Sequence, residues 1–236
     1  MMEQKTMEDS KKKLVITGSR GLIGKKLVDH YKDDYDVIEL DLVLGNDLTD
    51  ETYVNDWFKK NRDLYAIIVG HAFNPLPLEG ATKEEPIDVD LQNIRDYMET
   101  NVVSAFNVCR NFIRNNDGGV IINISSLYGR LSPKHFIYSD YTKPIGYSMS
   151  KSSVVLMTKY LATYYAPEFR VNAVVLGGVH DDKFQPDFYT NYNRNVPMGR
   201  QMDIEEVTSV FDFLLDEKST YVTGTELLID GGWNAW

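Results

Sequence analysis

The stretch that decides the fold is KKKLVITGSRGLIGKKLVDHY, residues 11–31. It passes from a short β-branched run, through a turn that holds Gly18, Gly21 and Gly24, into a segment with apolar residues at helical spacing. Glycine accepts the positive φ of a tight strand-to-helix turn and lets an anion approach the backbone closely. The helix that follows points its unpaired N–H groups at that anion. The stretch therefore predicts a dinucleotide pyrophosphate site; a turn used only for packing is the alternative.

A carboxylate at a fitting distance supports the dinucleotide interpretation. Asp41 lies at the end of a second β-branched run, YDVIELDL at residues 35–42, about twenty residues beyond the turn. There it can accept hydrogen bonds from the adenosine ribose hydroxyls. Its charge repels a 2′-phosphate and favours NAD, whereas Arg20 inside the turn could attract that phosphate and keeps NADP open. Arg20 could equally be a solvent-facing turn residue.

Apolar runs alternate with helical segments along the rest of the chain. Further runs are YAIIVG at 65–70, GGVIINISS at 118–126, RVNAVVLGG at 170–178 and TELLID at 225–230. Helices are expected after a cap at Thr49 or Asp50, over about 90–115, over 147–164 and around 204–211. The segments 74–86 and 177–200 read as loops. This order predicts an α/β protein whose parallel sheet is covered on both faces, in one domain over residues 12–236 after a flexible tail at 1–11.

Composition excludes several classes of partner. The net charge of −10 and the lack of a basic stripe argue against nucleic acid. No apolar run approaches the roughly 20 residues of a membrane helix, so we expect no membrane. The N-terminus has no apolar segment of a signal peptide. Cys109 is the only cysteine and four scattered histidines offer no metal spacing, so we expect a cytoplasmic protein without a metal.

A second group of residues carries chemistry. Tyr147 and Lys151 stand four apart on a predicted helix and so share one face. Ser125 and Ser126 end a predicted strand, at the edge where such sheets bind ligands. Asn101 lies inside the long helix, where asparagine is unfavourable. Each has an ordinary alternative: a surface pair, a strand-end hydroxyl, a hydrogen-bonded core amide.

Together these elements resemble the short-chain dehydrogenase/reductase family, over nearly the whole chain from about Lys13 to Trp236. The resemblance implies a Rossmann-like doubly wound sheet of about seven strands and a hydride transfer between a nicotinamide dinucleotide and a hydroxyl or keto group. The matching motifs, in order, are TGSRGLIG, DLTD at 47–50, Asn101, NISS, YSMSK, RVNAVVLGG, PMGR at 197–200, VTG at 222–224 and IDGGW at 229–233.

The resemblance also implies roles for individual residues. Tyr147 would be the general acid/base, with a pKa lowered by the Lys151 ammonium. Ser126 would hydrogen-bond the substrate oxygen, and Asn101 would anchor a water that relays protons from Lys151. The implied cofactor contacts are Gly18, Ser19, Arg20, Gly21, Leu22, Ile23, Asp41, Asp47, Leu48, His71, Ala72, Tyr147, Lys151, Gly177 and Val179.

Several departures from the family pattern stand out. The glycine spacing is that of the extended branch, and Gly70, His71, Ala72 and Phe73 replace the usual Asn-Asn-Ala-Gly. His71 could replace one lost asparagine contact. The residue before Gly177 is Leu176 instead of proline.

An insertion at about 130–146 over the site is the most informative departure. It contains His135, Phe136, Tyr138, Asp140, Tyr141 and Lys143. That mixture suits a hydroxylated, charged ligand such as a free or nucleotide-linked sugar; a loop that packs on its own protein or on a neighbouring subunit is the alternative. His180 and Asp181, which follow the strand at 170–178, either touch substrate or start a loop. The long spacer is similar, more weakly, to bacterial surface-sugar oxidoreductases, including flagellin-modification enzymes of legionaminic-type pathways.

Two functions from different classes therefore stay open. One is an NAD(P)-dependent oxidoreductase; the other is a non-catalytic dinucleotide-binding sensor or partner-binding subunit. The resemblance further implies a homodimer or homotetramer formed by the helices that contain Asn101 and Tyr147. Phe106, Val155 and Tyr160 could cover such a face, although Phe106 and Tyr160 could equally be core.

Overall fold

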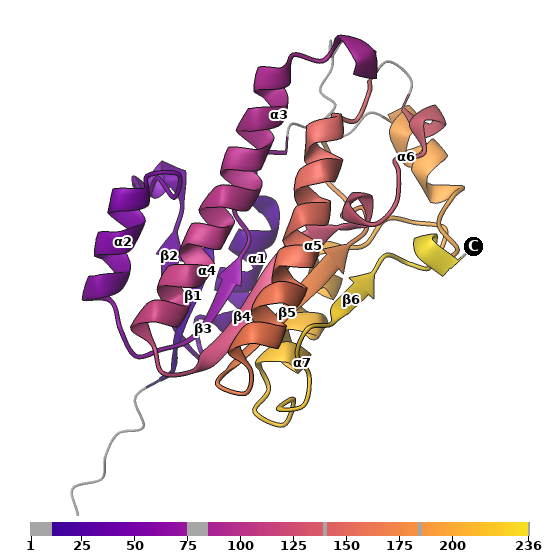
Figure 1. The fold of residues 1–236 in the computed structure, drawn as a ribbon. Coiled ribbons are helices and arrows are strands. Elements are labelled where there is room, and N and C mark those ends of the chain that lie inside the picture. Colours follow the sequence, from indigo (N-terminus) through magenta and orange to yellow (C-terminus); the bar gives the residue numbers. More distant parts are fainter. Residues whose placement is uncertain (1–10, 75–84, 139–140, 184–185, 236) are drawn as a thin grey trace, which may run out of the picture.

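The computed structural model describes residues 11–74, 85–138, 141–183 and 186–235. These form a parallel sheet between two layers of helices (Figure 1). The strands are β1 (Lys13–Thr17), β2 (Asp36–Leu40), β3 (Leu64–Val69), β4 (Gly119–Ser126), β5 (Phe169–Leu176) and β6 (Glu226–Ile229). The helices are α1 (Leu22–Tyr31), α2 (Glu51–Lys60), α3 (Leu91–Met98), α4 (Ser104–Asn115), α5 (Ile145–Tyr165), α6 (Pro186–Asn193) and α7 (Thr208–Leu215). The predicted tail at 1–11 lies, apart from Lys11, outside the described residues.

The strand order places a ligand edge in the sheet. The order is β2-β1-β3-β4-β5-β6, and all pairs are parallel. The chain moves outward from β1 to β2 and then returns to the other side of β1 for β3, which makes a topological switch point at the carboxyl end of β1. Thr17 there pairs with Leu40 on one side and Val69 on the other. The predicted doubly wound α/β class is confirmed.

The described sheet has six strands, whereas about seven were expected. The difference lies after β2. Only one short helical turn, Leu42–Leu44, stands between Asp41 and the Asp47 segment. A parallel strand needs a crossover of about a dozen residues, so no further strand can form there and β2 remains at the edge. The chain proceeds directly to α2, capped by the Asp50 carboxylate, which accepts hydrogen bonds from the N–H groups of Thr52 (2.8 Å) and Tyr53 (3.0 Å).

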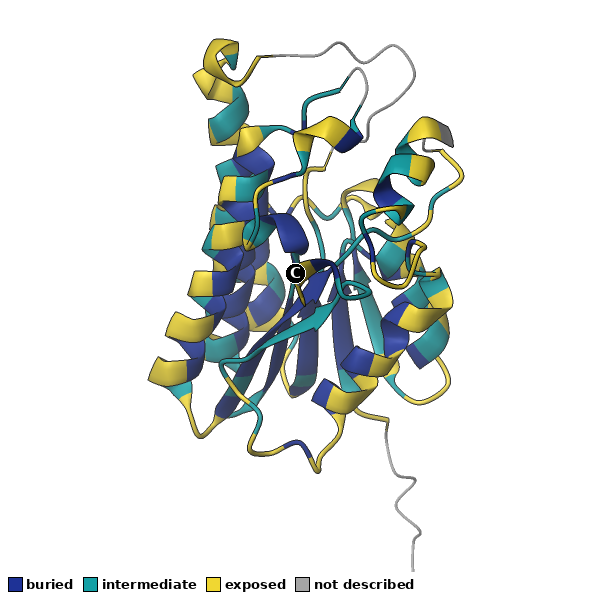
Figure 2. Cartoon of the chain, turned by 90° about the vertical axis from the view of Figure 1, so that its right-hand side faces the viewer, coloured by how far each residue is buried: buried dark blue, intermediate teal, exposed yellow. Residues whose placement is uncertain are grey.

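Each face of the sheet has its own hydrophobic core. Helices α2, α4 and α5 cover one face, where Phe58 and Phe112 are fully buried. Helices α1 and α7 cover the other, with Leu27 and Phe211. Burying such a side chain stabilises the fold by about 1.5–3 kcal/mol, so these layers hold the strand ends rigidly. Figure 2 shows the buried strands between helices whose outer faces are exposed. Within the described residues, no helix combines the length and apolarity needed to cross a membrane.

The helical prediction is right in extent and incomplete in detail. The long helix expected over 90–115 is α3 and α4 joined by a π-helical turn at Glu99–Val103, which contains Asn101. The helix expected over 147–164 is α5. The segment 177–200 was expected to be a loop, and that is wrong because it contains α6. Only Phe188 and Tyr192 give α6 an apolar stripe, which is too short a pattern to read from sequence.

The predicted interface residues divide between surface and core. Phe106 on α4 and Tyr160 on α5 are exposed, at 42% and 66% of their surface. Val155 was expected on the same face, but it is buried within the protomer. Leu156, its neighbour in the chain, is 68% exposed instead.

Candidate active site

The three glycines between β1 and α1 serve three different purposes. Gly18 has a φ of +67°, and a Cβ there would lie 2.7 Å from the backbone nitrogen of His71. A Cβ on Gly24 would lie 2.1 Å from the carbonyl oxygen of Gly18, so Gly24 lets α1 pack against the turn. A Cβ on Gly21 would meet only that same oxygen, at 3.4 Å. Gly21 therefore keeps open a space that the protein itself does not fill.

Asp41 stands beside this turn. Its carboxylate accepts hydrogen bonds from the backbone N–H groups of Arg20 (2.9 Å) and Val43 (3.1 Å). The Arg20 guanidinium forms an ion pair with Glu39 at 2.9 Å. Ser19 is fully buried, and its hydroxyl has no hydrogen-bond partner in the described part of the chain. The acidic end of β2 thus faces the glycine turn, with the nearest basic side chain already paired.

One cavity of about 430 Å³ joins the glycine turn to the carboxyl ends of β4 and β5. Ten of the predicted site residues line it: Gly18, Gly21, Leu22, Ile23, Ala72, Ser126, Tyr147, Lys151, Gly177 and Val179. Seven do not line it: Ser19, Arg20, Asp41, Asp47, Leu48, His71 and Asn101. Among the described residues, no cluster of three or more His, Cys, Asp or Glu side chains is arranged to hold a metal.

Tyr147 and Lys151 come from the first turns of α5 and both are buried. The Lys151 ammonium lies 6.0 Å from the centre of the Tyr147 ring and donates a hydrogen bond to the carbonyl of Ile124 at 2.9 Å. The Ser126 hydroxyl, at the end of β4, accepts from the N–H of Tyr128 at 3.2 Å. A phenol, an ammonium and a hydroxyl therefore meet at the wall of one cavity.

The pKa of Tyr147 differs from the value expected from the sequence. Burial raises the pKa of Tyr147, and a hydrogen bond with Ser126 only partly offsets it. The expected lowering by Lys151 is absent, since burial also lowers the pKa of Lys151, to about 8. Burial disfavours the charged form of each group, so Tyr147 holds its proton more tightly than a free tyrosine does. At neutral pH the phenol is protonated in this state.

Asn101 has a definite structural task. Its side-chain oxygen accepts from the N–H of Phe73 at 2.6 Å, and its side-chain nitrogen donates to the carbonyl of Phe73 (3.1 Å) and to the hydroxyl of Ser150 (3.0 Å). Ser150 in turn donates to the carbonyl of Tyr147 at 2.8 Å. Both amide hydrogens are used, so Asn101 ties the loop after β3 to the start of α5. The proton-relay water assigned to Asn101 stays a prediction.

His71 also links elements. Its Nδ1 lies 2.7 Å from the hydroxyl of Thr17 on β1, and its Nε2 lies 2.8 Å from that of Ser104 on α4. Ser104 donates its own hydrogen to the carbonyl of Thr100 at 2.6 Å, so it accepts from Nε2–H and leaves Nδ1 to accept from Thr17. The ring is neutral, and burial lowers its pKa to about 4. Both ring nitrogens of His71 are hydrogen-bonded within the protein. A contact between His71 and a cofactor stays a prediction.

Asp47 and Leu48, expected beside adenine, hold the start of α2. Asp47 accepts from the N–H (2.9 Å) and the hydroxyl (2.6 Å) of Thr49, which lowers its pKa. Leu48 is buried in the core under α2. Their contact with a cofactor stays a prediction.

The insertion at 130–146 contributes to both core and cavity; Asp140 lies outside the described residues. Ile137 and Tyr138 pack in a third apolar cluster with Trp233 near the C-terminus. Tyr138 and Lys143 also line the cavity. Phe136 is 72% exposed. Part of the insertion therefore packs on its own protein and part lines the cavity, and binding of a hydroxylated, charged ligand by it stays a prediction.

Sequence reasoning missed part of the cavity wall. The missed side chains include Asn74, Tyr128, Lys183, Phe188, Tyr192 and Gln201. Asp181 lines the cavity as proposed, whereas His180 does not. Among these missed residues, only the aromatic ones could have been noticed in the sequence. Aromatic residues more often belong to the hydrophobic core than to a binding site.

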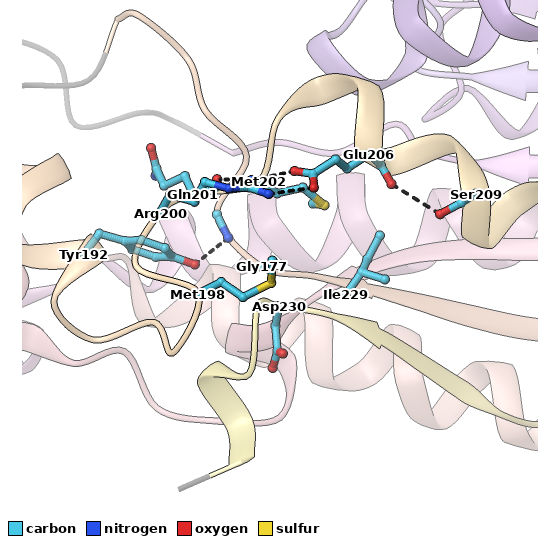
Figure 3. Close-up of a pocket in the computed structure, with 12 residues that line it drawn as sticks. Gly177, Tyr192, Met198, Arg200, Gln201, Met202, Glu206, Ser209, Ile229 and Asp230 are labelled. Carbon is cyan, nitrogen blue, oxygen red and sulfur yellow. Dashed lines mark hydrogen bonds and ion pairs between the residues drawn. The ribbon is translucent and has the colours of Figure 1, made fainter.

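A second cavity, of about 280 Å³, lies beyond Gly177 and Gly178 (Figure 3). The hydroxyl of Tyr192 accepts from the N–H of Gly178 at 2.5 Å, and Arg200 pairs with Glu206 through both of its terminal nitrogens, at 2.6 and 2.8 Å. Tyr192, Arg200 and Glu206 are thus hydrogen-bonded within the protein.

Comparisons with known proteins agree with this geometry. A family model described as Enoyl-(Acyl carrier protein) reductase matches residues 6–234. The chain is 33% identical over 158 residues to a glucose 1-dehydrogenase from Gluconobacter oxydans, covering 61% of this chain and 55% of that one. It is 26% identical over 234 residues to the 3-oxoacyl-acyl-carrier-protein reductase FabG of Aquifex aeolicus, covering 93% and 86%. The chain spans 43–60% of the length of four of the curated relatives it matches.

A solved structure is similar over nearly the full length. It is a short chain dehydrogenase from Leptospira borgpetersenii with bound NAD+, with a TM-score of 0.81 and 28% identity over 99% of this chain and 97% of that one. The family model, these relatives and the ordered motifs lead to one conclusion. The chain belongs to the short-chain dehydrogenase/reductase family of NAD(P)-dependent oxidoreductases.

Proposed function

We propose that this protein transfers hydride between a nicotinamide dinucleotide and a hydroxyl or keto group of a small, sugar-like substrate, with Tyr147 as general acid/base. One observation carries the proposal: Ser126, Tyr147 and Lys151 line the same cavity as the glycine turn. A protein that only bound the dinucleotide would have no use for a phenol and a hydroxyl at the far end of that cavity.

The residues at the glycine turn fit a dinucleotide. A Cβ on Gly21 would fill space that no protein atom occupies closely, and the N–H groups of the first turn of α1 have no side-chain cap. Asp41 is positioned for a ribose, since its carboxylate already lies 2.9 Å from the Arg20 nitrogen of the turn. When bound, the dinucleotide would supply or accept the hydride.

The protein's own side chains would donate and accept the proton. A protonated Tyr147 can give its proton to a carbonyl oxygen, and Ser126 can donate a second hydrogen bond to that oxygen as charge develops. The Lys151 ammonium, with a pKa of about 8, would then stabilise the phenolate. Oxidation of an alcohol uses the same groups in the opposite order.

NAD is the cofactor we infer over NADP. A 2′-phosphate on the ribose would meet Asp41, and Arg20 is engaged by Glu39 at 2.9 Å. The similar structure from Leptospira binds NAD+. Wild type should bind NADH at least about tenfold more tightly than NADPH, because like charges about 4 Å apart at a protein surface repel by about 1–4 kcal/mol, and a factor of ten needs about 1.4 kcal/mol. Asp41→Asn should narrow that ratio, measured by fluorescence titration; equal affinities in wild type would contradict the inference.

A sugar-like substrate is supported by the cavity wall and by one relative. Tyr128, Tyr138, Phe188 and Tyr192 supply aromatic surface, on which sugar faces stack. The relative from Gluconobacter oxydans is a glucose 1-dehydrogenase. A nucleotide-linked sugar fits the same description.

The proposed function is tested by measuring turnover in wild type and in a variant that lacks one hydrogen-bonding side chain of the site. NADH oxidation is followed against a panel of keto-sugars, and NAD+ reduction against the matching alcohols. Ser126→Ala should lower kcat by about 10²–10³-fold on any substrate found, while NADH affinity stays within about twofold. If wild type turns over no member of a broad panel, the sensor or partner-binding alternative gains support.

Self-association through α4 and α5 is part of the proposal. Phe106, Leu156, Tyr160 and Tyr164 are exposed on these helices, and exposed apolar side chains that gather on one face are typical of an interface. A homodimer or homotetramer would bury it. Light scattering at micromolar concentration should give at least two subunits, and Leu156→Lys should lower the mass. Leu42→Lys, at an equally exposed site in the short helical turn Leu42–Leu44, is the control. A monomeric wild type would contradict the prediction.

We also infer a reducing compartment, the cytoplasm. Cys109 is a fully buried residue of α4, and burial raises its pKa to about 12, so its thiol is unreactive. A protein with one inert thiol needs no oxidising environment. Fractionation of the native cell tests this inference.

A further inference from the structure

The cavity contains a second buried lysine that the proton chemistry does not use. Lys143 comes from the insertion and is 8% exposed. Its ammonium lies 4.1 Å from the centre of the Tyr147 ring, closer than that of Lys151 at 6.0 Å. It donates one hydrogen bond, of 2.6 Å, to the side-chain oxygen of Asn74. The residue therefore stands over the reacting phenol on the substrate side of the site.

Within the described part of the chain, no acidic side chain forms an ion pair with Lys143. An ammonium has three donor hydrogens, and its hydrogen-bond and ring partners in the described part of the chain, Asn74 and Tyr147, are neutral groups. Burial first, and then the nearby Lys151 charge, lowers the pKa of Lys143 to about 7. Asp181 lines the same cavity but makes no ion pair with it in the described residues. A buried cation without a counter-charge is costly, and the cost is recovered if a ligand brings the counter-charge.

The balance of charges along the cavity points the same way. Its ionisable lining, tyrosines aside, comprises three lysines and one aspartate, Lys143, Lys151, Lys183 and Asp181, in a protein with a net charge of −10. A cavity of one sign inside a molecule of the other concentrates ligands of opposite charge. The part of the cavity beyond the glycine turn therefore favours an anionic ligand.

A second polar side chain of the cavity wall has no hydrogen-bond partner in the described part of the chain. Gln201 is 5% exposed, and neither its side-chain oxygen nor its nitrogen has a hydrogen-bond partner in the described part of the chain. It lines this cavity and the smaller one behind it (Figure 3). Buried amides are nearly always hydrogen-bonded. A hydroxyl, which both donates and accepts, would satisfy Gln201.

We propose that the substrate carries an acidic oxygen group, carboxylate or phosphate, that pairs with Lys143, and a hydroxyl that binds Gln201. The proposal rests on the proposed function in that the same cavity takes the substrate. Lys143 is then a specificity-determining residue, set over Tyr147 so that the anion is held beside the reacting carbon. A different role, adjustment of the Tyr147 proton affinity, would affect every substrate equally.

The experiment uses substrates matched in all but charge. Glucose, glucuronate and glucose 6-phosphate, with their keto or alcohol counterparts, are compared in wild type and Lys143→Met, which keeps the apolar stem. Wild type should prefer an anionic member at least tenfold in kcat/KM, and the two anions distinguish carboxylate from phosphate. Lys143→Met should lose that preference through KM and leave the neutral member unchanged. Lys218→Met, which removes an exposed lysine that lines neither cavity, is the control and should keep the preference.

Binding separates this proposal from the proposed function. Glucuronate and glucose 6-phosphate are titrated by calorimetry into the full protein with saturating NADH. Binding by wild type and at least tenfold weaker binding by Lys143→Met support the proposal even without turnover. Three results overturn it: no binding of either anion, an equal loss of kcat on neutral and anionic substrates, or weaker NADH binding in Lys143→Met by the same factor.

Discussion

The imidazole of His71 makes the stability of this protein depend on pH. It bridges Thr17 on β1 and Ser104 on α4, at 2.7 and 2.8 Å, and is buried in its neutral form. Burial and the Lys151 charge lower its pKa from 6.5 to about 4, against a smaller opposing effect of Asp41. A base with a lower pKa in the folded state binds more protons when unfolded. The folded state is therefore destabilised as pH falls from 6.5 towards 4.

The magnitude follows from those two values. Between pH 7 and pH 5, a shift from 6.5 to about 4 lowers the free energy of unfolding by about 2 kcal/mol. The variant His71→Gln cannot titrate, and its amide keeps a donor for Ser104. At pH 7 it should be about 1 kcal/mol less stable than wild type, because Thr17 loses its acceptor. At pH 5 wild type alone carries the protonation cost, so the variant should be as stable or more stable.

Urea denaturation at pH 7, 6 and 5 measures both proteins. The carboxylates and the other histidines are present in both and cancel in the difference. The difference in unfolding free energy should change by about 2 kcal/mol across the range. If the two proteins instead lose stability in parallel, to within about 0.5 kcal/mol, then His71 is not held neutral by burial and the account of the β1–α4 bridge is wrong.

Further predictions concern the glycine turn and the long helix. Gly24→Ala should destabilise the protein by more than about 3 kcal/mol, because its Cβ would lie 2.1 Å from the Gly18 oxygen, whereas Gly21→Ala should fold normally and weaken NADH binding at least tenfold. Denaturation and fluorescence titration check the pair, and equal effects on stability would contradict it. Asn101→Ala should lower the unfolding free energy by about 2 kcal/mol, because it releases both backbone groups of Phe73. Unchanged stability with slower turnover would instead favour a purely chemical role for Asn101.

The parts of the fold that could be predicted are those fixed by local pattern. The glycine turn, the strand that ends near Asp41 and the helix that carries Tyr147 and Lys151 each have a signature within about twenty residues. The number of strands was not fixed in this way, since the expectation of about seven came from the family resemblance. The short chain between Asp41 and Asp47 decided it, because no crossover fits there.

The parts of the site that could not be predicted depend on tertiary burial. The pKa of Tyr147 is raised, although the neighbouring lysine in sequence implied a lowered value, because burial acts on both groups. Tyr192 reaches the cavity from α6, which carries no motif, and Gln201 directly follows the PMGR motif without being part of it. Lys143 was noted only as one polar residue of the insertion, and its place over the Tyr147 ring needs the path of the whole loop.

The central claim is tested most directly by removing one oxygen atom. Tyr147→Phe should leave NADH affinity within about twofold and reduce turnover by about 10²–10⁴-fold, because only the proton donor is lost. Tyr97→Phe is the matched control: its ring lies 6.3 Å from that of Tyr147, and its hydroxyl has no hydrogen-bond partner in the described residues. The control should keep full turnover. Near-normal turnover by Tyr147→Phe, or an equal loss in Tyr97→Phe, would contradict the account.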